Sequence, residues 1–225
     1  MERRLSFGEV IGATFGLMSS DLQAALSMVI AIAAAVSVLD IMKPNGGGLL
    51  GIPILVVHYY MIRRVVDRQG LRSADKPGGF GSFFVLGIMT GVPILLGYVL
   101  LILPGLYLSA RWAMVDAALL AENRGASDAI GRSWNATKGH ELPIALAFVL
   151  INLPMIAAIA FQFLSARAVP GNVQPVVGDR NVVYGVMIIA NLLLYASQVT
   201  SWYFGVALYQ LLVGPAETQL NEVFA

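Results

Sequence analysis

Long apolar stretches separated by short polar segments make up most of the chain. Several of these stretches reach about 20 residues, the length that one helix needs to cross the hydrocarbon core of a bilayer. We therefore expect an all-α fold, a polytopic membrane helical bundle formed by one integral membrane domain over residues 1–225. The apolar pattern predicts six spans, at residues 22–42, 49–64, 80–103, 106–121, 142–164 and 182–213.

Two of these spans have a competing interpretation. Arg3 and Arg4 precede the first span, as in a signal peptide, but its apolar region is longer than the about 7–15 residues typical of such peptides, so we expect no cleavage. The fourth span, residues 106–121, contains Arg111 and Asp116. A re-entrant or interfacial segment is the alternative there.

Glycines at four-residue spacing mark two helical faces. Residues 5–20 are amphipathic and predict an interfacial helix, although a helix that merely leads into the first span is the alternative. Because small residues let helices approach closely, we predict packing at the glycines spaced in this way, which are Gly8, Gly12 and Gly16 in the first segment and Gly87 and Gly91 in the third span.

Composition excludes most soluble classes. Hydrophobic residues make up 58% of the chain and charged residues only 12%, whereas soluble domains average about 25% charged residues. The net charge of +1 offers no basic surface for nucleic acid, and the absence of cysteine excludes disulfides and thiolate metal sites. These numbers indicate an integral membrane protein whose surroundings are membrane lipids.

Basic residues predict the orientation. Six spans place both termini on one side, and that side collects ten lysines and arginines: Arg3, Arg4, five in segment 63–79, Arg124, Arg132 and Lys138. The opposite side holds three, which are Lys43, Arg167 and Arg180. Because cytoplasmic loops carry the excess of positive charge, we expect both termini in the cytoplasm.

Several polar residues fall near the middle of predicted spans. A charge at that depth costs roughly 2.5–3.5 kcal/mol on insertion scales, so such residues tend to pair or line cavities. One hypothesis is a polar cluster that moves a proton or binds a polar ligand or headgroup; the other is hydrogen bonding that merely holds helices together. The residues concerned are His58, Asp116, Asn152 and Asn191, with Arg111 within reach.

A second candidate site lies on a short surface helix predicted over residues 126–138. Its polar and aromatic residues would suit an anionic headgroup or a docking partner at the cytoplasmic face, and the alternative is a helix anchored by its tryptophan. The residues concerned are Arg132, Ser133, Trp134, Thr137 and Lys138.

The centre of the chain resembles a known family. The pattern consists of Leu103-Pro104-Gly105-Leu106-Tyr107-Leu108, Arg111, Glu122, Ala129, Ser133-Trp134 and Thr137-Lys138-Gly139, with Leu5-Ser6-Phe7-Gly8-Glu9 and Ala207-Leu208-Tyr209 near the ends. It is similar to a bacterial multi-span family that includes the membrane domain of glycerophosphodiester phosphodiesterases. The resemblance implies a helical bundle in the bacterial cytoplasmic (inner) membrane. It does not imply phosphodiesterase activity, which in those enzymes belongs to a separate soluble barrel domain.

No catalytic constellation is evident in the sequence. The two histidines, His58 and His140, fall at different depths, and neither a Gly-x-Ser-x-Gly elbow nor a phosphate-binding loop is present. We therefore expect no enzyme activity, cofactor or metal. The expected role is an accessory, scaffold or assembly subunit that binds other membrane-protein subunits. The alternative is a small transporter or lipid-handling protein that uses the polar cluster.

Overall fold

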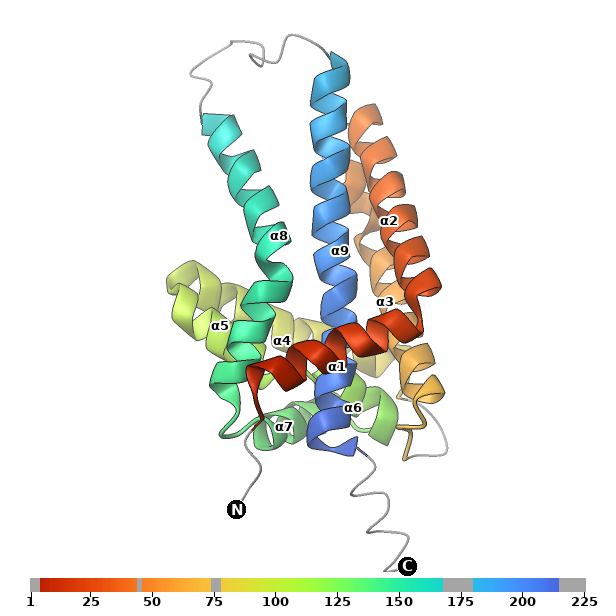
Figure 1. Cartoon of the computed structure of the whole chain (residues 1–225), viewed down its shortest axis with the longest axis vertical. Helices are drawn as coiled ribbons and strands as arrows, with labels where there is room; N and C mark the ends of the chain where they lie inside the picture. The colour runs from red at the N-terminus through yellow and green to blue at the C-terminus, as the bar shows by residue number, and fades with distance from the viewer. Residues whose placement is uncertain (1–4, 44–45, 74–77, 168–179, 215–225) are drawn as a thin grey trace, which may run out of the picture. The chain divides into compact units, whose positions relative to one another are not determined.

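The computed structural model describes residues 5–43, 46–73, 78–167 and 180–214, and helices account for most of them (Figure 1). No strand occurs in this part of the chain, which confirms the all-α helical bundle. The helices are α1 (Phe7–Ser20), α2 (Leu22–Met42), the short 3-10 helix η1 (Gly46–Leu50), α3 (Gly51–Arg68), α4 (Phe80–Leu100), α5 (Ile102–Arg111), α6 (Val115–Glu122), α7 (Ala126–Ala136), α8 (Glu141–Arg167) and α9 (Arg180–Leu212).

Five helical stretches are long and apolar enough to cross a membrane. Most residues in the apolar window of each stretch are not buried within the protein, so the stretch presents apolar side chains to its surroundings, as a membrane-spanning helix does. The protein is therefore a multi-pass membrane protein. The stretches are Leu22–Met42, Gly46–Arg68, Phe80–Leu100, Glu141–Ala160 and Tyr184–Leu212.

The chain divides into two compact units, which we describe separately. Unit 1 comprises Met1–Ser20, Leu55–Val149 and Trp202–Ala225. Unit 2 comprises Asp21–Ile54 and Leu150–Ser201. Helices α3, α8 and α9 contribute residues to both units. The buried side chains of unit 1 include large apolar groups from several helices, namely Met61, Ile62, Phe83, Leu86, Leu119, Leu120, Ile144, Tyr203, Phe204 and Leu208.

The predicted fourth span is not a single helix. Residues 106–121 are divided between α5 and α6, which are ten and eight residues long and separated by a turn at 112–114. Neither helix reaches the length of about 20 residues that a crossing requires. The segment predicted as the fourth span is therefore broken into two helices, because the first of them ends at Arg111.

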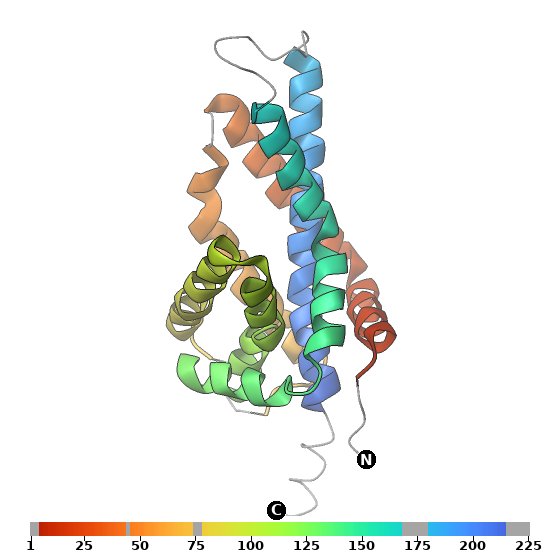
Figure 2. The same cartoon turned by 90° about the vertical axis from the view of Figure 1, so that its left-hand side faces the viewer.

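In unit 1, α4 and the segment formed by α5 and α6 run out and back (Figure 2). Gly97 of α4 lies against Gly105 of α5, where a Cβ on Gly97 would come within 2.8 Å of the Gly105 backbone. At the other end, the backbone N–H of Ser73 donates to the carbonyl of Ala121 at 3.0 Å. Segments 69–73 and 122–124 therefore lie at the same end of this hairpin.

The glycines predicted to pack face open space within the described chain. A Cβ added to Gly8, Gly12, Gly16, Gly87 or Gly91 would meet no heavy atom within 4 Å beyond the glycine's immediate surroundings. Other glycines make the close approaches instead: Gly97 lies against Gly105, and a Cβ added to Gly205 would come within 2.8 Å of the Ala113 carbonyl oxygen. Spacing alone did not distinguish the glycines that pack internally from those that do not.

Helix α1 forms over nearly the residues predicted for the first helix. Ser6 and Glu9 form a reciprocal cap, in which the Glu9 N–H donates to Ser6 Oγ at 3.2 Å and the Ser6 N–H donates to Glu9 Oε2 at 2.8 Å. The helix buries Val10, Thr14 and Leu17 within unit 1. The face that carries Gly8, Gly12 and Gly16 is exposed.

Substitution of Gly97 by leucine should destabilise the hairpin. The new side chain would collide with the Gly105 backbone, which cannot rotate away, so we expect a loss of at least about 1–3 kcal/mol, as for overpacking in a core. Unfolding of the detergent-solubilised protein, followed by circular dichroism, measures this loss. Gly91→Leu on the same helix is the control, and an equal loss in both variants would contradict the proposed close approach.

Candidate functional site

His58 and Asp116 form an ionisable pair within unit 1. His58 lies on α3 and Asp116 lies in the first turn of α6, and His58 Nε2 is 3.5 Å from Asp116 Oδ2. The side chains retain 18% and 30% of their exposed surface, so the pair is partly shielded but not sealed. These are two of the residues that the sequence placed together.

Two aromatic rings fix the orientation of the His58 imidazole. The Trp202 ring of α9 stacks on it, with centroids 4.6 Å apart and planes 16° apart. Phe83 of α4 meets it edge-on at 5.1 Å. His58 Nε2 is buried and has no hydrogen-bond partner among the described residues. The imidazole is therefore held with one nitrogen toward a carboxylate, at a distance slightly too long for an ordinary hydrogen bond.

The other residues predicted for this cluster have different partners. In unit 2, Asn152 Oδ1 accepts a hydrogen bond from Ser201 Oγ at 3.2 Å, and Asn191 Nδ2 donates one to Ser37 Oγ at 3.0 Å. These bonds join α8 to α9 and α9 to α2, as interhelical hydrogen bonds in membranes do. Of the five predicted residues, the structure pairs His58 with Asp116 within unit 1, and the two asparagines form hydrogen bonds within unit 2.

Arg111, the fifth residue of that grouping, is buried at the end of α5 and is only 2% exposed. Its Nη1 donates to Glu141 Oε1 at 2.8 Å. Its guanidinium carbon lies 4.2 Å from the centroid of the Trp134 ring, which is a cation–π geometry that gains strength when desolvated. An anion at the start of α8 and an aromatic face on α7 together stabilise this buried charge.

The Arg111 backbone is tied to α7 as well. Its carbonyl oxygen accepts hydrogen bonds from Ser133 Oγ at 2.8 Å and Thr137 Oγ1 at 3.2 Å. Carbonyls at a helix end lack intrahelical partners, so these hydroxyls satisfy an acceptor that the end of α5 leaves free. Ser133 and Thr137 are fully buried. The headgroup site predicted from them is corrected: they face the protein interior.

Glu122, at the end of α6, is contacted by three hydrogen-bond donors. Arg124 forms an ion pair with it, Arg132 Nε lies 3.1 Å from its Oε1, and Tyr209 Oη donates to Oε1 at 2.9 Å. Burial alone would raise the pKa of Glu122, but the hydrogen bonds from these three residues and the charge of Arg132 outweigh burial and lower the pKa below its usual value. Arg132 is thus engaged within the protein, whereas Lys138 is exposed.

The start of α1 joins the same region. The backbone N–H of Leu5 donates to His140 Nδ1 at 3.2 Å. The opening segment, the central pattern and Tyr209 are therefore parts of one arrangement in unit 1. Sequence reasoning listed Glu122 and Tyr209 only through the family resemblance and gave them no role, and it missed Glu141. The sequence does show Glu141 at the start of a predicted span and an arginine, Arg111, within another. That combination could have indicated an ion pair between them.

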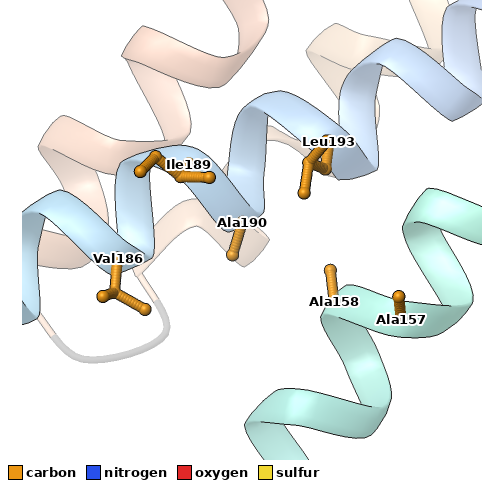
Figure 3. Close-up of a pocket in the computed structure, with 6 residues that line it drawn as sticks. All are labelled: Ala157, Ala158, Val186, Ile189, Ala190 and Leu193. Atoms are coloured by element: carbon orange, nitrogen blue, oxygen red, sulfur yellow. The ribbon is translucent and has the colours of Figure 1, made fainter.

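Unit 2 contains an apolar groove between α8 and α9 (Figure 3). Its volume is about 250 Å³, and aliphatic side chains line it: Ala157 and Ala158 from α8, and Val186, Ile189, Ala190 and Leu193 from α9. Both sets fall within stretches long enough to cross a membrane. Among the described residues, no three histidine, aspartate or glutamate side chains are grouped as metal ligands would be.

A family model matches the larger part of the chain. Residues 83–224, more than half of the chain, match the family model described as the membrane domain of glycerophosphoryl diester phosphodiesterase. No curated protein and no solved structure matches the chain. The matched region contains Arg111, Glu122, Trp134 and Tyr209, whose contacts are described above.

The contacts of Glu122 predict an acid-sensitive stability. Because its pKa is lower in the folded protein than in the unfolded chain, its contribution is fully present above the usual glutamate pKa of about 4.3 and is lost as the pH falls through the lower folded value. We expect Glu122→Gln to be less stable than the wild type near neutral pH, with the difference shrinking on acidification. Unfolding midpoints measured across this pH range check it.

Asp128→Asn removes an exposed carboxylate of α7 and controls for the loss of one negative charge. A stability difference between the wild type and Glu122→Gln that is constant from neutral to acidic pH would rule out this role of the ion pairs.

Proposed function

The chain belongs to the family of the membrane domain of glycerophosphoryl diester phosphodiesterase, and from this premise we propose that it is a non-catalytic scaffold or assembly subunit of a membrane complex. This proposal concerns the membrane domain alone. It assigns no phosphodiesterase activity to the chain.

The main support for this proposal is that the polar residues of the family pattern form contacts with other residues of the same chain. Arg111 is paired with Glu141 and Trp134, and its carbonyl is bonded to Ser133 and Thr137. Glu122 is paired with arginines and Tyr209. Polar groups engaged in this way fix helices relative to one another rather than act on a substrate. A rigid frame suits a protein whose task is to hold partners.

Two helices of unit 1 offer faces to such partners. On α4, Gly87 and Gly91 are exposed with open space beside them, and the same holds for Gly8, Gly12 and Gly16 on α1. Glycines four residues apart allow a neighbouring transmembrane helix to approach closely. We infer that a helix of another membrane-protein subunit packs on the Gly87–Gly91 face of α4.

We also propose a bacterial inner-membrane location with both termini in the cytoplasm. The excess of basic residues supports this orientation, and so does the hydrogen bond between Ser73 and Ala121, since it joins two segments of the same predicted side. Reporter tags at residue 225 and within segment 63–79 should report the same face of the membrane. Tags on opposite faces would overturn the orientation.

Leucine at both Gly87 and Gly91 should remove the partner. Tagged protein purified from native membranes in mild detergent should retain another membrane protein in stoichiometric amount, and the double substitution should reduce that amount at least about tenfold by blocking close approach. Gly81→Leu, on the same helix with no neighbour within 4 Å, is the matched control.

A wild-type protein that retains no membrane protein, or a double variant that retains it as well as Gly81→Leu does, would refute the scaffold role on this face. Both variants must unfold at the same temperature as the wild type, which separates the loss of a partner from the loss of the fold.

Lipid handling is the second candidate, and the groove in unit 2 is what favours it. A dry apolar cavity of about 150 Å³ can hold a molecule the size of benzene, and this groove is larger and lined only by aliphatic side chains. A phospholipid with a photoreactive acyl chain should crosslink to residues at the groove. Ala158→Phe should abolish crosslinking there, whereas Ala34→Phe, on an exposed position of α2, should not. Equal crosslinking in both variants would exclude the groove as a lipid site.

A further inference from the structure

We propose that His58 and Asp116 form a proton-binding site that holds one proton between α3 and α6 of unit 1. The ligand is the proton itself, taken up at the contact of an imidazole nitrogen with a carboxylate oxygen 3.5 Å away. This inference goes beyond the proposed scaffold role and does not depend on it.

The imidazole of His58 is held in one orientation. Trp202 stacks on the ring and Phe83 meets its edge, so rotation of the ring would break both contacts. Nε2 therefore stays directed at Asp116. It is also buried without a hydrogen-bond partner in the described part of the chain. A buried nitrogen of this kind gains most from a proton that bonds it to its neighbour.

A neutral His58 beside an ionised Asp116 leaves a net charge of −1 in a mostly apolar environment, where an unpaired charge is costly. Uptake of one proton gives either imidazolium with carboxylate or imidazole with carboxylic acid. Both forms have no net charge, and both place a proton between Nε2 and Oδ2. No bond other than the new N–H or O–H bond forms, and no redox partner is needed.

Around His58, α4 and α9 contribute the aromatic rings of Phe83 and Trp202. No lysine or arginine forms an ion pair with Asp116 among the residues described.

Three polar groups close to the pair in the sequence have partners of their own. Arg111, which precedes Asp116 by five residues, is paired with Glu141. Glu122, on the same helix as Asp116, is paired with Arg124 and Arg132. Tyr59, beside His58, donates its hydroxyl to the Gly78 carbonyl at 3.0 Å. These three groups are therefore not the counter-ion of Asp116, and a proton shared with His58 fills that role in the proposal.

Asp116 keeps 30% of its side-chain surface and His58 keeps 18%, so the described residues do not seal the pair from its surroundings. Because the pair joins α3 to α6, its protonation state sets how firmly the two helices are fastened. Acidification should tighten this contact, in the opposite sense to its effect on Glu122.

Nitrogen NMR of the histidine side chains tests the proposal directly. The chain has only two histidines, so His140→Gln leaves His58 as the single reporter. We expect the imidazole nitrogen signals of His58 to change with pH, and we expect Asp116→Asn to shift the midpoint of that change by at least about one pH unit, a tenfold change in proton affinity. Asp128→Asn, which removes an exposed carboxylate of α7, should leave the midpoint unchanged.

Infrared spectroscopy of the wild type covers the form in which the carboxyl carries the proton. A carboxylic C=O band that appears on acidification and is absent in Asp116→Asn supports the site. His58→Gln, which keeps the Asp116 carboxyl, should change the pH at which this band appears. This variant tests the site if Asp116→Asn does not fold.

A His58 titration that is identical in the Asp116→Asn and Asp128→Asn variants, together with no band assignable to Asp116, would overturn the proposal. These measurements use purified protein alone, whereas partner retention is measured from membranes. A failure of one proposal is therefore distinguishable from a failure of the other.

Discussion

The burial of one positive charge, that of Arg111, is the constraint on which the arrangement of unit 1 depends. A side chain that is 2% exposed cannot rely on water for its charge or for its backbone carbonyl. Glu141 and Trp134 stabilise the guanidinium, and Ser133 and Thr137 satisfy the carbonyl. Because these partners come from α7 and the start of α8, satisfying this residue fixes the end of α5 against both helices. Removal of Glu141 would leave the buried charge of Arg111 without its anion, which costs about 3–5 kcal/mol for a buried pair.

The same requirement explains why the chain between α4 and α7 is not a continuous span. Helix α5 ends at Arg111, where side chains replace the next turn of hydrogen bonds. Helix α6 then places Asp116 next to His58. At its end, Glu122 contacts Arg132 and Tyr209. A straight span through these residues would have left three ionisable groups facing hydrocarbon. Two short helices allow each group to find a partner.

The two units handle polar groups differently. Unit 1 buries ionisable residues in pairs and surrounds them with aromatic rings. Unit 2 uses single hydrogen bonds between uncharged side chains, such as that between Asn191 and Ser37, and leaves an apolar groove between α8 and α9. Unit 1 also contains the segments on which the family resemblance rests. These differences are why we assign the frame and the proton site to unit 1 and consider lipid only in unit 2.

The sequence by itself determined the membrane class, the all-α fold and most helix positions, because runs of about 20 apolar residues have few other solutions in a bilayer. It also placed His58 near Asp116, since both fall at similar depth along their segments. Only the tertiary structure decided which polar groups pair and which glycines pack. Arg111 binds Glu141, which lies 30 residues further along the chain, and Gly97 rather than Gly87 meets another helix. Local periodicity gives the face of a helix but not the identity of the helix opposite it, so pairings of this kind cannot be read from spacing.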